Sequence, residues 1–122
     1  MKFAIKNTTP IKIVTDCLVI VVFKNGILSE EAEIVNRGCD KAITKLINNN
    51  DFTGELGETA LIQNMAGCRT PRVLLLGAGD RKELNAKNFI KAMRKALQKI
   101  FATKAKNVHF AFSNLELNDR QN

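Results

Sequence analysis

Three groups of residues in this chain have types and spacings that could support chemistry, and the first is the glycine turn Gly77-Ala78-Gly79. The turn follows the apolar run 73–76 and comes before a long amphipathic segment, and backbone N–H groups in such turns can hold a phosphate. A dinucleotide-binding fingerprint also needs a third glycine three residues on, where this chain has Lys82. We therefore predict a tight corner between strand and loop, with a phosphate or ADP-ribose cradle between Gly77 and Asp80 as the alternative.

The second group is the set of basic side chains on the amphipathic segment 86–104, which we expect to be a helix. No acidic residue occurs between Glu83 and Glu116, so most of the formal net charge of +7 lies in this segment. The face is either a solvated helix surface or a surface that contacts the phosphates of nucleic acid. No aromatic residue interleaves on it, so any such binding should be weakly sequence-specific and strongly salt-dependent. The basic residues that lie away from the apolar stripe and form this face are Lys87, Lys91, Arg94, Lys95 and Lys99.

The third group consists of single polar residues, and none of them forms a catalytic or metal-binding pattern. His109 is the only histidine and lies in an alternating apolar segment, so we expect an ordinary strand or surface histidine. The glutamates of the segment 30–33 fit the start of a helix, where the helix dipole favours anions, and Asp80 and Glu83 fit a loop. With no Ser-His-Asp, Cys-His or paired-carboxylate signal, we predict no catalytic residue, no metal ligand and no cofactor in this segment.

Three cysteines are scattered along the chain without a Cys-x-x-Cys pair, which is typical of a reducing compartment. Cys17 begins an apolar run and Cys39 lies on an apolar helical face, so we expect both to be small core residues. The longest apolar run, 17–23, is far too short to span a membrane, and the N-terminus has no apolar stretch of the kind found in signal peptides. We therefore expect a soluble cytoplasmic protein with no membrane partner.

The elements that must position these groups follow from the apolar periodicity of a chain of 122 residues, 45% of them hydrophobic, which is long enough for one domain. Strands are predicted over residues 2–6, 11–14, 17–23, 58–64, 72–76 and 107–112. Ser29 should cap a helix that runs to Ile47, in which Gly38 predicts a close contact or a break. The second helix, 86–104, should bury the stripe Phe89, Met93, Leu97, Ile100 and Phe101. Strands alternating with two helices predict an α/β sandwich with a mixed sheet.

Several stretches of the sequence, in register over almost the whole chain, resemble one known family. Residues 1–6 are followed by the run Asp16-Cys17-Leu18-Val19-Ile20. Residues 51–59 read Asp-Phe-Thr-Gly-Glu-Leu-Gly-Glu-Thr, and residues 72–79 read Arg-Val-Leu-Leu-Leu-Gly-Ala-Gly. These two stretches are similar to Asp-Phe-x-Gly-Lys-x-Gly-Glu and Arg-Val-Leu-Leu-Val-Gly-Leu-Gly in the N-terminal domain of the leucyl (cytosol) aminopeptidases. The departures are Glu55, where that family often has Lys, and Ala78, where it usually has Leu.

The resemblance implies a macro-domain-like three-layer sandwich and a non-catalytic role for this domain. In that family the larger C-terminal domain binds two divalent metals, commonly zinc or manganese, through Asp, Glu and Lys side chains. A metal-activated water then attacks the N-terminal peptide bond of a peptide substrate and releases the first amino acid. The family's signature Asn-Thr-Asp-Ala-Glu-Gly-Arg does not occur here, so no catalytic residue is carried over to this chain.

The resemblance also implies how the chain is organised and what it associates with. Residues 1–113 correspond to the N-terminal domain, residues 114–122 to the start of an interdomain linker or helix, and the catalytic C-terminal domain is absent from this chain. The parent enzyme is expected to be a homohexamer, in which this domain shapes assembly and access to the catalytic site. Some bacterial members of the family bind DNA, which is compatible with the basic face of the segment 86–104.

Overall fold

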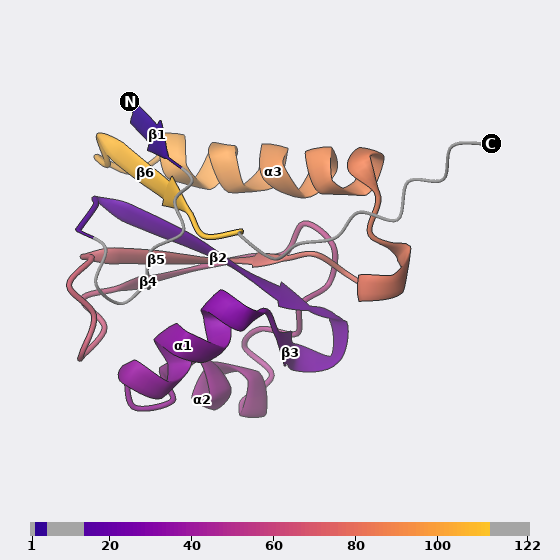
Figure 1. The fold of residues 1–122 in the computed structure, drawn as a ribbon, viewed down its shortest axis with the longest axis horizontal. Helices are drawn as coiled ribbons and strands as arrows, with labels where there is room; N and C mark the ends of the chain where they lie inside the picture. The colour runs from indigo at the N-terminus through magenta and orange to yellow at the C-terminus, as the bar shows by residue number, and fades with distance from the viewer. Residues whose placement is uncertain (1, 5–13, 113–122) are drawn as a thin grey trace.

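The computed structural model describes the backbone of residues 2–4, and both the backbone and the side chains of residues 14–112 (Figure 1). Four of the expectations above fall on other residues: the end of the first strand at 5–6, most of the strand 11–14, the domain boundary at 113 and the linker 114–122. Those expectations lie outside the described residues. The rest of the chain forms a mixed sheet between helices.

The sheet has the strand order β1-β6-β2-β5-β4, with a short additional strand, β3, beside β2. The strands are β1 (Lys2–Ala4), β2 (Cys17–Phe23), β3 (Ile27–Leu28), β4 (Thr59–Gln63), β5 (Arg72–Gly77) and β6 (Asn107–Phe110). The neighbours β1–β6, β6–β2 and β2–β5 are parallel, whereas β4 runs antiparallel to β5 and β3 antiparallel to β2. The mixed sheet is therefore confirmed, and β3 is a strand that the periodicity did not predict.

The helices cover both faces of this sheet, which gives three layers (Figure 1). Helices α1 (Glu30–Gly38) and α2 (Ala42–Asn48) lie on one face, and α3 (Ala86–Phe101) lies on the other. Two single 3₁₀ turns, Lys24–Gly26 and Arg81–Glu83, follow β2 and β5 respectively. The predicted cap at Ser29 is confirmed, because Ser29 Oγ accepts a hydrogen bond from Ala32 N (3.2 Å). Asn85 caps α3 in the same way, since its Oδ1 accepts a hydrogen bond from Asn88 N (2.9 Å).

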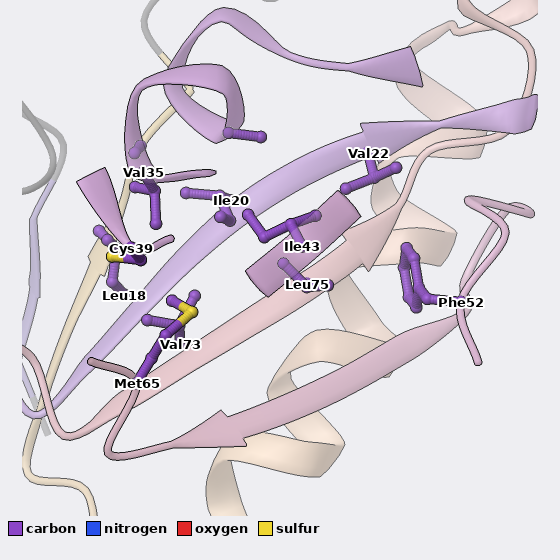
Figure 2. Close-up of a cluster of buried hydrophobic side chains, with 12 residues drawn as sticks. Leu18, Ile20, Val22, Val35, Cys39, Ile43, Phe52, Met65, Val73 and Leu75 are labelled. Carbon is purple, nitrogen blue, oxygen red and sulfur yellow. The ribbon is translucent and has the colours of Figure 1, made fainter. Parts of the chain in front are cut away.

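β2 lies at the centre of the core, and all seven of its side chains are buried. Alternate residues of β2 point to opposite faces, so each face has its own cluster. Figure 2 shows the cluster under α1 and α2, where Leu18, Ile20 and Val22 meet residues of the two helices and of β5. Under α3, Cys17 and Val19 pack against a second cluster that includes Ala92, Ala96 and Ile100. The prediction that Cys17 and Cys39 are core residues is confirmed.

The first predicted helix is divided in two at the position that Gly38 indicated. Asp40 (φ +55°) and Lys41 (φ +54°) adopt left-handed backbone conformations that end α1 and turn the chain. Asn36 then starts α2, because its Oδ1 accepts hydrogen bonds from Ile43 N and Thr44 N, both 3.1 Å, and its Nδ2 donates to Thr44 Oγ1 (2.7 Å). The break is therefore stabilised by a side chain inside the first helix.

The predicted buried stripe of α3 was partly wrong. The residues nearest the sheet are Ala92, Ala96 and Ile100, while Phe89, Met93 and Leu97 flank them and are half-buried. Phe101 was predicted to be buried and is 62% exposed. The stripe was chosen by side-chain size, whereas small alanines permit the helix to lie close to the sheet. The helix also ends at Phe101 rather than at Lys104, because Thr103 Oγ1 donates a hydrogen bond to Ile100 O (2.6 Å).

Candidate functional site: a filled sheet end and a basic helix face

The carboxyl ends of β2 and β5 lie side by side, at the edge where open α/β sheets commonly bind ligands. The glycine corner 77–79 lies at this edge, and each of its N–H groups has a partner within the chain. Gly77 N donates to Glu58 O (2.7 Å), Ala78 N to Val22 O (3.0 Å) and Gly79 N to Gly54 O (2.9 Å). The corner therefore presents no N–H group to a phosphate, and the predicted tight turn is confirmed.

The loop between α2 and β4 supplies two of these partners, and it fills the space outside β5. Gly57 N donates to Gly77 O (2.9 Å), and a Cβ added to Gly77 would collide with the carbonyl oxygen of Glu55. A hollow of about 140 Å³ lies beside the corner, and its lining includes Glu55, Asp80 and Glu83 with one lysine, Lys24. This surplus of negative charge opposes the entry of a phosphate.

The filling loop is held by one carboxylate, that of Glu58. Its Oε1 accepts four hydrogen bonds, from Thr53 N (3.1 Å), Thr53 Oγ1 (2.9 Å), Gly54 N (2.8 Å) and Glu55 N (3.2 Å). Burial by itself raises the pKa of Glu58, but the bonds from Thr53, Gly54 and Glu55 outweigh it and hold the pKa below its usual value. Successive N–H groups of this kind form an anion-binding concavity, and here the anion is the chain's own glutamate.

The outer face of α3 has the opposite character. All five basic residues predicted for it, Lys87, Lys91, Arg94, Lys95 and Lys99, are exposed. No ion pair or hydrogen bond joins these five side chains to another residue in the described part of the chain. Two exposed apolar residues, Ile90 (51%) and Phe101 (62%), also lie on α3.

The single polar residues have the structural roles that the sequence suggested. His109 lies in β6 and is 4% exposed, and Asp80 caps a 3₁₀ turn by accepting a hydrogen bond from Lys82 N (2.9 Å). Within the described ranges, no group of three or more His, Cys, Asp or Glu side chains could hold a metal ion. None of the helices described here is long and apolar enough to cross a membrane.

The role of Glu58 was missed at the level of sequence. The sequence gives residues 51–59 as a family-like motif and predicts that Glu58 begins the strand 58–64, whereas β4 begins at Thr59. The signal that could have revealed its role is the spacing Thr53-Gly54-Glu55 followed by Glu58, in which a carboxylate three to five residues on can turn back onto consecutive N–H groups. The sequence does not show that the loop 54–58 packs against Gly77.

Solved structures with similar folds support the three-layer prediction. A mutant tomato leucine aminopeptidase aligns with a TM-score of 0.71 and 13% sequence identity, over 95% of this chain and 24% of that one. The macrodomain of Mycobacterium tuberculosis DarG aligns with a TM-score of 0.70 and 12% identity, over 95% of this chain and 81% of that one. At such identities the similarity shows the fold alone, and it confirms a macro-domain-like α/β sandwich.

Sequence relatives identify the family. A probable cytosol aminopeptidase of Xylella fastidiosa is 29% identical over 120 residues, which are 98% of this chain and 24% of that protein. A cytosol aminopeptidase of Buchnera aphidicola is 30% identical over 119 residues, again 98% of this chain and 24% of the relative. The chain thus spans about a quarter of the length of the curated relatives it matches. The family model described as "Cytosol aminopeptidase family, N-terminal domain" matches residues 19–122, so this chain belongs to the cytosol aminopeptidase family as its N-terminal domain.

Proposed function

We propose that this chain is the non-catalytic N-terminal domain of a cytoplasmic aminopeptidase, whose remaining sequence forms the catalytic domain and releases N-terminal amino acids from peptides by two-metal hydrolysis. The observation that carries the proposal is the family match over residues 19–122, together with a chain that spans 24% of its curated relatives. In the proposed enzyme, residues 1–113 form this domain and residues 114–122 begin the connection to the catalytic part.

The chemistry of the described side chains supports a non-catalytic role. Two-metal hydrolysis needs several carboxylates directed at one point, and residues 14–112 bring no such group together. We therefore assign zinc or manganese, and the peptide substrate, to the rest of the parent protein. The domain would act on assembly, as part of a homohexamer, and on access to the catalytic site.

An activity assay with a metal analysis tests this assignment. The purified chain is incubated with leucyl-p-nitroanilide in the presence of manganese or zinc, and its bound metal is measured after dialysis. We expect no metal-dependent release of nitroaniline and no stoichiometric metal. Turnover, or one equivalent of tightly bound zinc or manganese, would contradict the non-catalytic role. Reading the coding sequence past Asn122 provides a second test, because a downstream Asn-Thr-Asp-Ala-Glu-Gly-Arg segment is expected.

A second candidate function, contact with DNA phosphates, rests on the exposed basic face of α3. Five cations on one helix face, without a partner among the described residues, can neutralise phosphates and release counterions. A gel shift with a duplex of arbitrary sequence at low salt tests it. We expect a retarded band that weakens steeply as salt is added and that depends little on sequence. The absence of a retarded band at low salt would refute this function.

Binding of ADP-ribose near Gly77 to Asp80 is the candidate that the geometry supports least. The N–H groups of the glycine corner are all bonded within the chain, and the hollow beside them is lined by carboxylates. Calorimetric titration with millimolar ADP-ribose should therefore show no heat of binding. Saturable heat would require the loop 54–58 to leave its position on β5.

A further inference from the structure

Two of the three cysteines come together where the connection between β4 and β5 meets the junction of α1 and α2. Cys39 follows the last residue of α1 and is 1% exposed, and Cys68 is half-buried and packs against the hydrophobic cluster that contains Cys39. The preceding residue, Gly67 (φ +84°), brings the two backbones into contact. A Cβ on Gly67 would collide with the carbonyl oxygen of Gly38 and would lie 3.4 Å from Cys39 Cα.

The two thiols differ in accessibility, and this sets the order in which they can react. Burial, and then the neighbouring Cys68 thiol, raises the pKa of Cys39 to about 11, so Cys39 stays protonated at neutral pH. Cys68 is partly exposed and can be reached by a small oxidant. Cys17 provides an internal comparison, because it is fully buried in β2 and burial also raises its pKa to about 11.

We propose that Cys39 and Cys68 are a redox-sensitive pair that forms a reversible disulfide within the chain when the protein meets a peroxide. In the first step the Cys68 sulfur attacks the O–O bond and becomes a sulfenic acid, and one water leaves. In the second step the Cys39 sulfur displaces the hydroxyl group of that sulfenic acid as a second water, with the thiol proton, and the S–S bond forms. Two thiols are oxidised and one peroxide is reduced to two waters. A thiol reductant reverses the reaction.

The disulfide would join two segments that the sequence separates by α2 and β4. It would therefore close a ring that contains both elements, which restricts the unfolded chain and stabilises the folded one. Transient disulfides of this kind are compatible with a reducing compartment, where they act as sensors. This inference concerns the fold of the domain, so it is independent of the proposed aminopeptidase and DNA-binding functions.

The experiment treats the folded chain with hydrogen peroxide, blocks the remaining thiols with an alkylating reagent and digests with trypsin. Trypsin separates the three cysteines into the peptides 13–24, 38–41 and 46–69. We expect a cross-linked product of peptides 38–41 and 46–69 that disappears on reduction, while peptide 13–24 stays alkylatable after unfolding. The melting temperature should rise on oxidation, by on the order of 5–10 °C.

Two variants make the result decisive. Cys68→Ser changes a half-exposed side chain, so it should fold, lose the cross-link and show no rise of the melting temperature on oxidation. Cys17→Ala should retain the cross-link, because Cys17 lies in the other cluster, under α3. Oxidation of Cys68 to a sulfinic acid without a link to Cys39 would overturn the proposal. Cross-links that join two chains, or that involve Cys17 as often as Cys39, would overturn it as well.

Discussion

The end of the sheet beside Gly77 and the outer face of α3 use their polar groups in opposite ways. At the sheet end, three consecutive N–H groups and the Glu58 carboxylate all find partners within the chain, and the loop 54–58 covers them. On α3, five cations project into solvent without a partner in the described part of the chain. The polar groups at the sheet end therefore stabilise the fold, whereas the cations of α3 are exposed to solvent.

The difference between the two regions shows why a shared fold does not by itself imply a shared function. The backbone aligns with a macrodomain at a TM-score of 0.70, and the sheet edge where open α/β folds commonly bind ligands is present. In this chain that edge is occupied by its own loop and lined by carboxylates. The proposed contact with DNA is therefore expected on the outer face of α3 rather than at the sheet end.

The largest effect is expected from a Gly77→Ala variant, which tests how tightly the sheet end is filled. The added Cβ collides with the backbone of Glu55, so either the loop or β5 must move. We expect the free energy of unfolding to fall by about 3 kcal/mol, measured by urea denaturation.

Gly57→Ala is the matched control for this variant. A Cβ on Gly57 (φ +83°) meets only a flexible side-chain atom, Lys95 Cγ, at 3.3 Å. The cost should be confined to the backbone conformation, about 1 kcal/mol. Equal losses in the two variants would mean that the loop is not packed against β5 as described.

Charge reversal on α3 tests whether its basic face contacts DNA. Replacement of Lys91, Arg94, Lys95 and Lys99 by Glu should abolish the gel shift at low salt, a loss of at least about 100-fold in affinity, because phosphate contacts are replaced by repulsion. The free energy of unfolding should change little, since all four side chains are exposed.

The control for charge reversal carries the same change in net charge at exposed positions outside α3, namely Lys24, Arg37, Lys41 and Arg69 to Glu. This variant should still retard DNA, with a reduction that reflects the overall charge alone. If both variants lose binding equally, the effect belongs to net charge and α3 is not the contact surface.

A smaller effect is expected from Glu58→Gln. The amide lacks the charge that strengthens the four hydrogen bonds to Oε1, and solvent screens this charge because Glu58 is partly exposed. The free energy of unfolding at neutral pH should therefore fall by about 1 kcal/mol. The folded state holds the pKa of Glu58 below its usual value of 4.5. Its contribution is therefore present above that value and is lost as the pH falls through the lower, folded-state pKa.

Denaturation curves of the two proteins at several pH values check this. The stability difference between wild type and Glu58→Gln should be constant near neutral pH and should shrink at acidic pH, where wild-type Glu58 is also uncharged. A difference that stays the same at every pH would show that the carboxylate charge does not hold the loop.

The fold was predictable where local signals and burial agree. The continuous apolar run 17–23 is the central strand, and Ser29 caps the helix that follows it in sequence. Gly38 marked the break between α1 and α2, but the residue that stabilises the break, Asn36, acts through contacts seven and eight residues away. The prediction that Phe101 is buried was wrong, because side-chain size does not indicate how closely a helix lies against the sheet.

The candidate sites were predictable to different degrees for the same reason. The basic face of α3 follows from helical periodicity alone, so the exposure of all five basic residues was predictable. The filling of the sheet end depends on a contact between residues 54–58 and 77–79, which are distant in sequence and meet through the pairing of β4 with β5. Periodicity carries no information about such a contact.

Amide NMR spectra of the chain, recorded during titration with a DNA duplex and separately with ADP-ribose, test the contrast between the two regions most directly. We predict that DNA shifts the amide signals of α3 around Lys87 to Lys99, and that residues 77–79 stay unchanged with either ligand. Shifts at residues 77–79 on addition of ADP-ribose, or DNA-dependent shifts that avoid α3, would contradict the account.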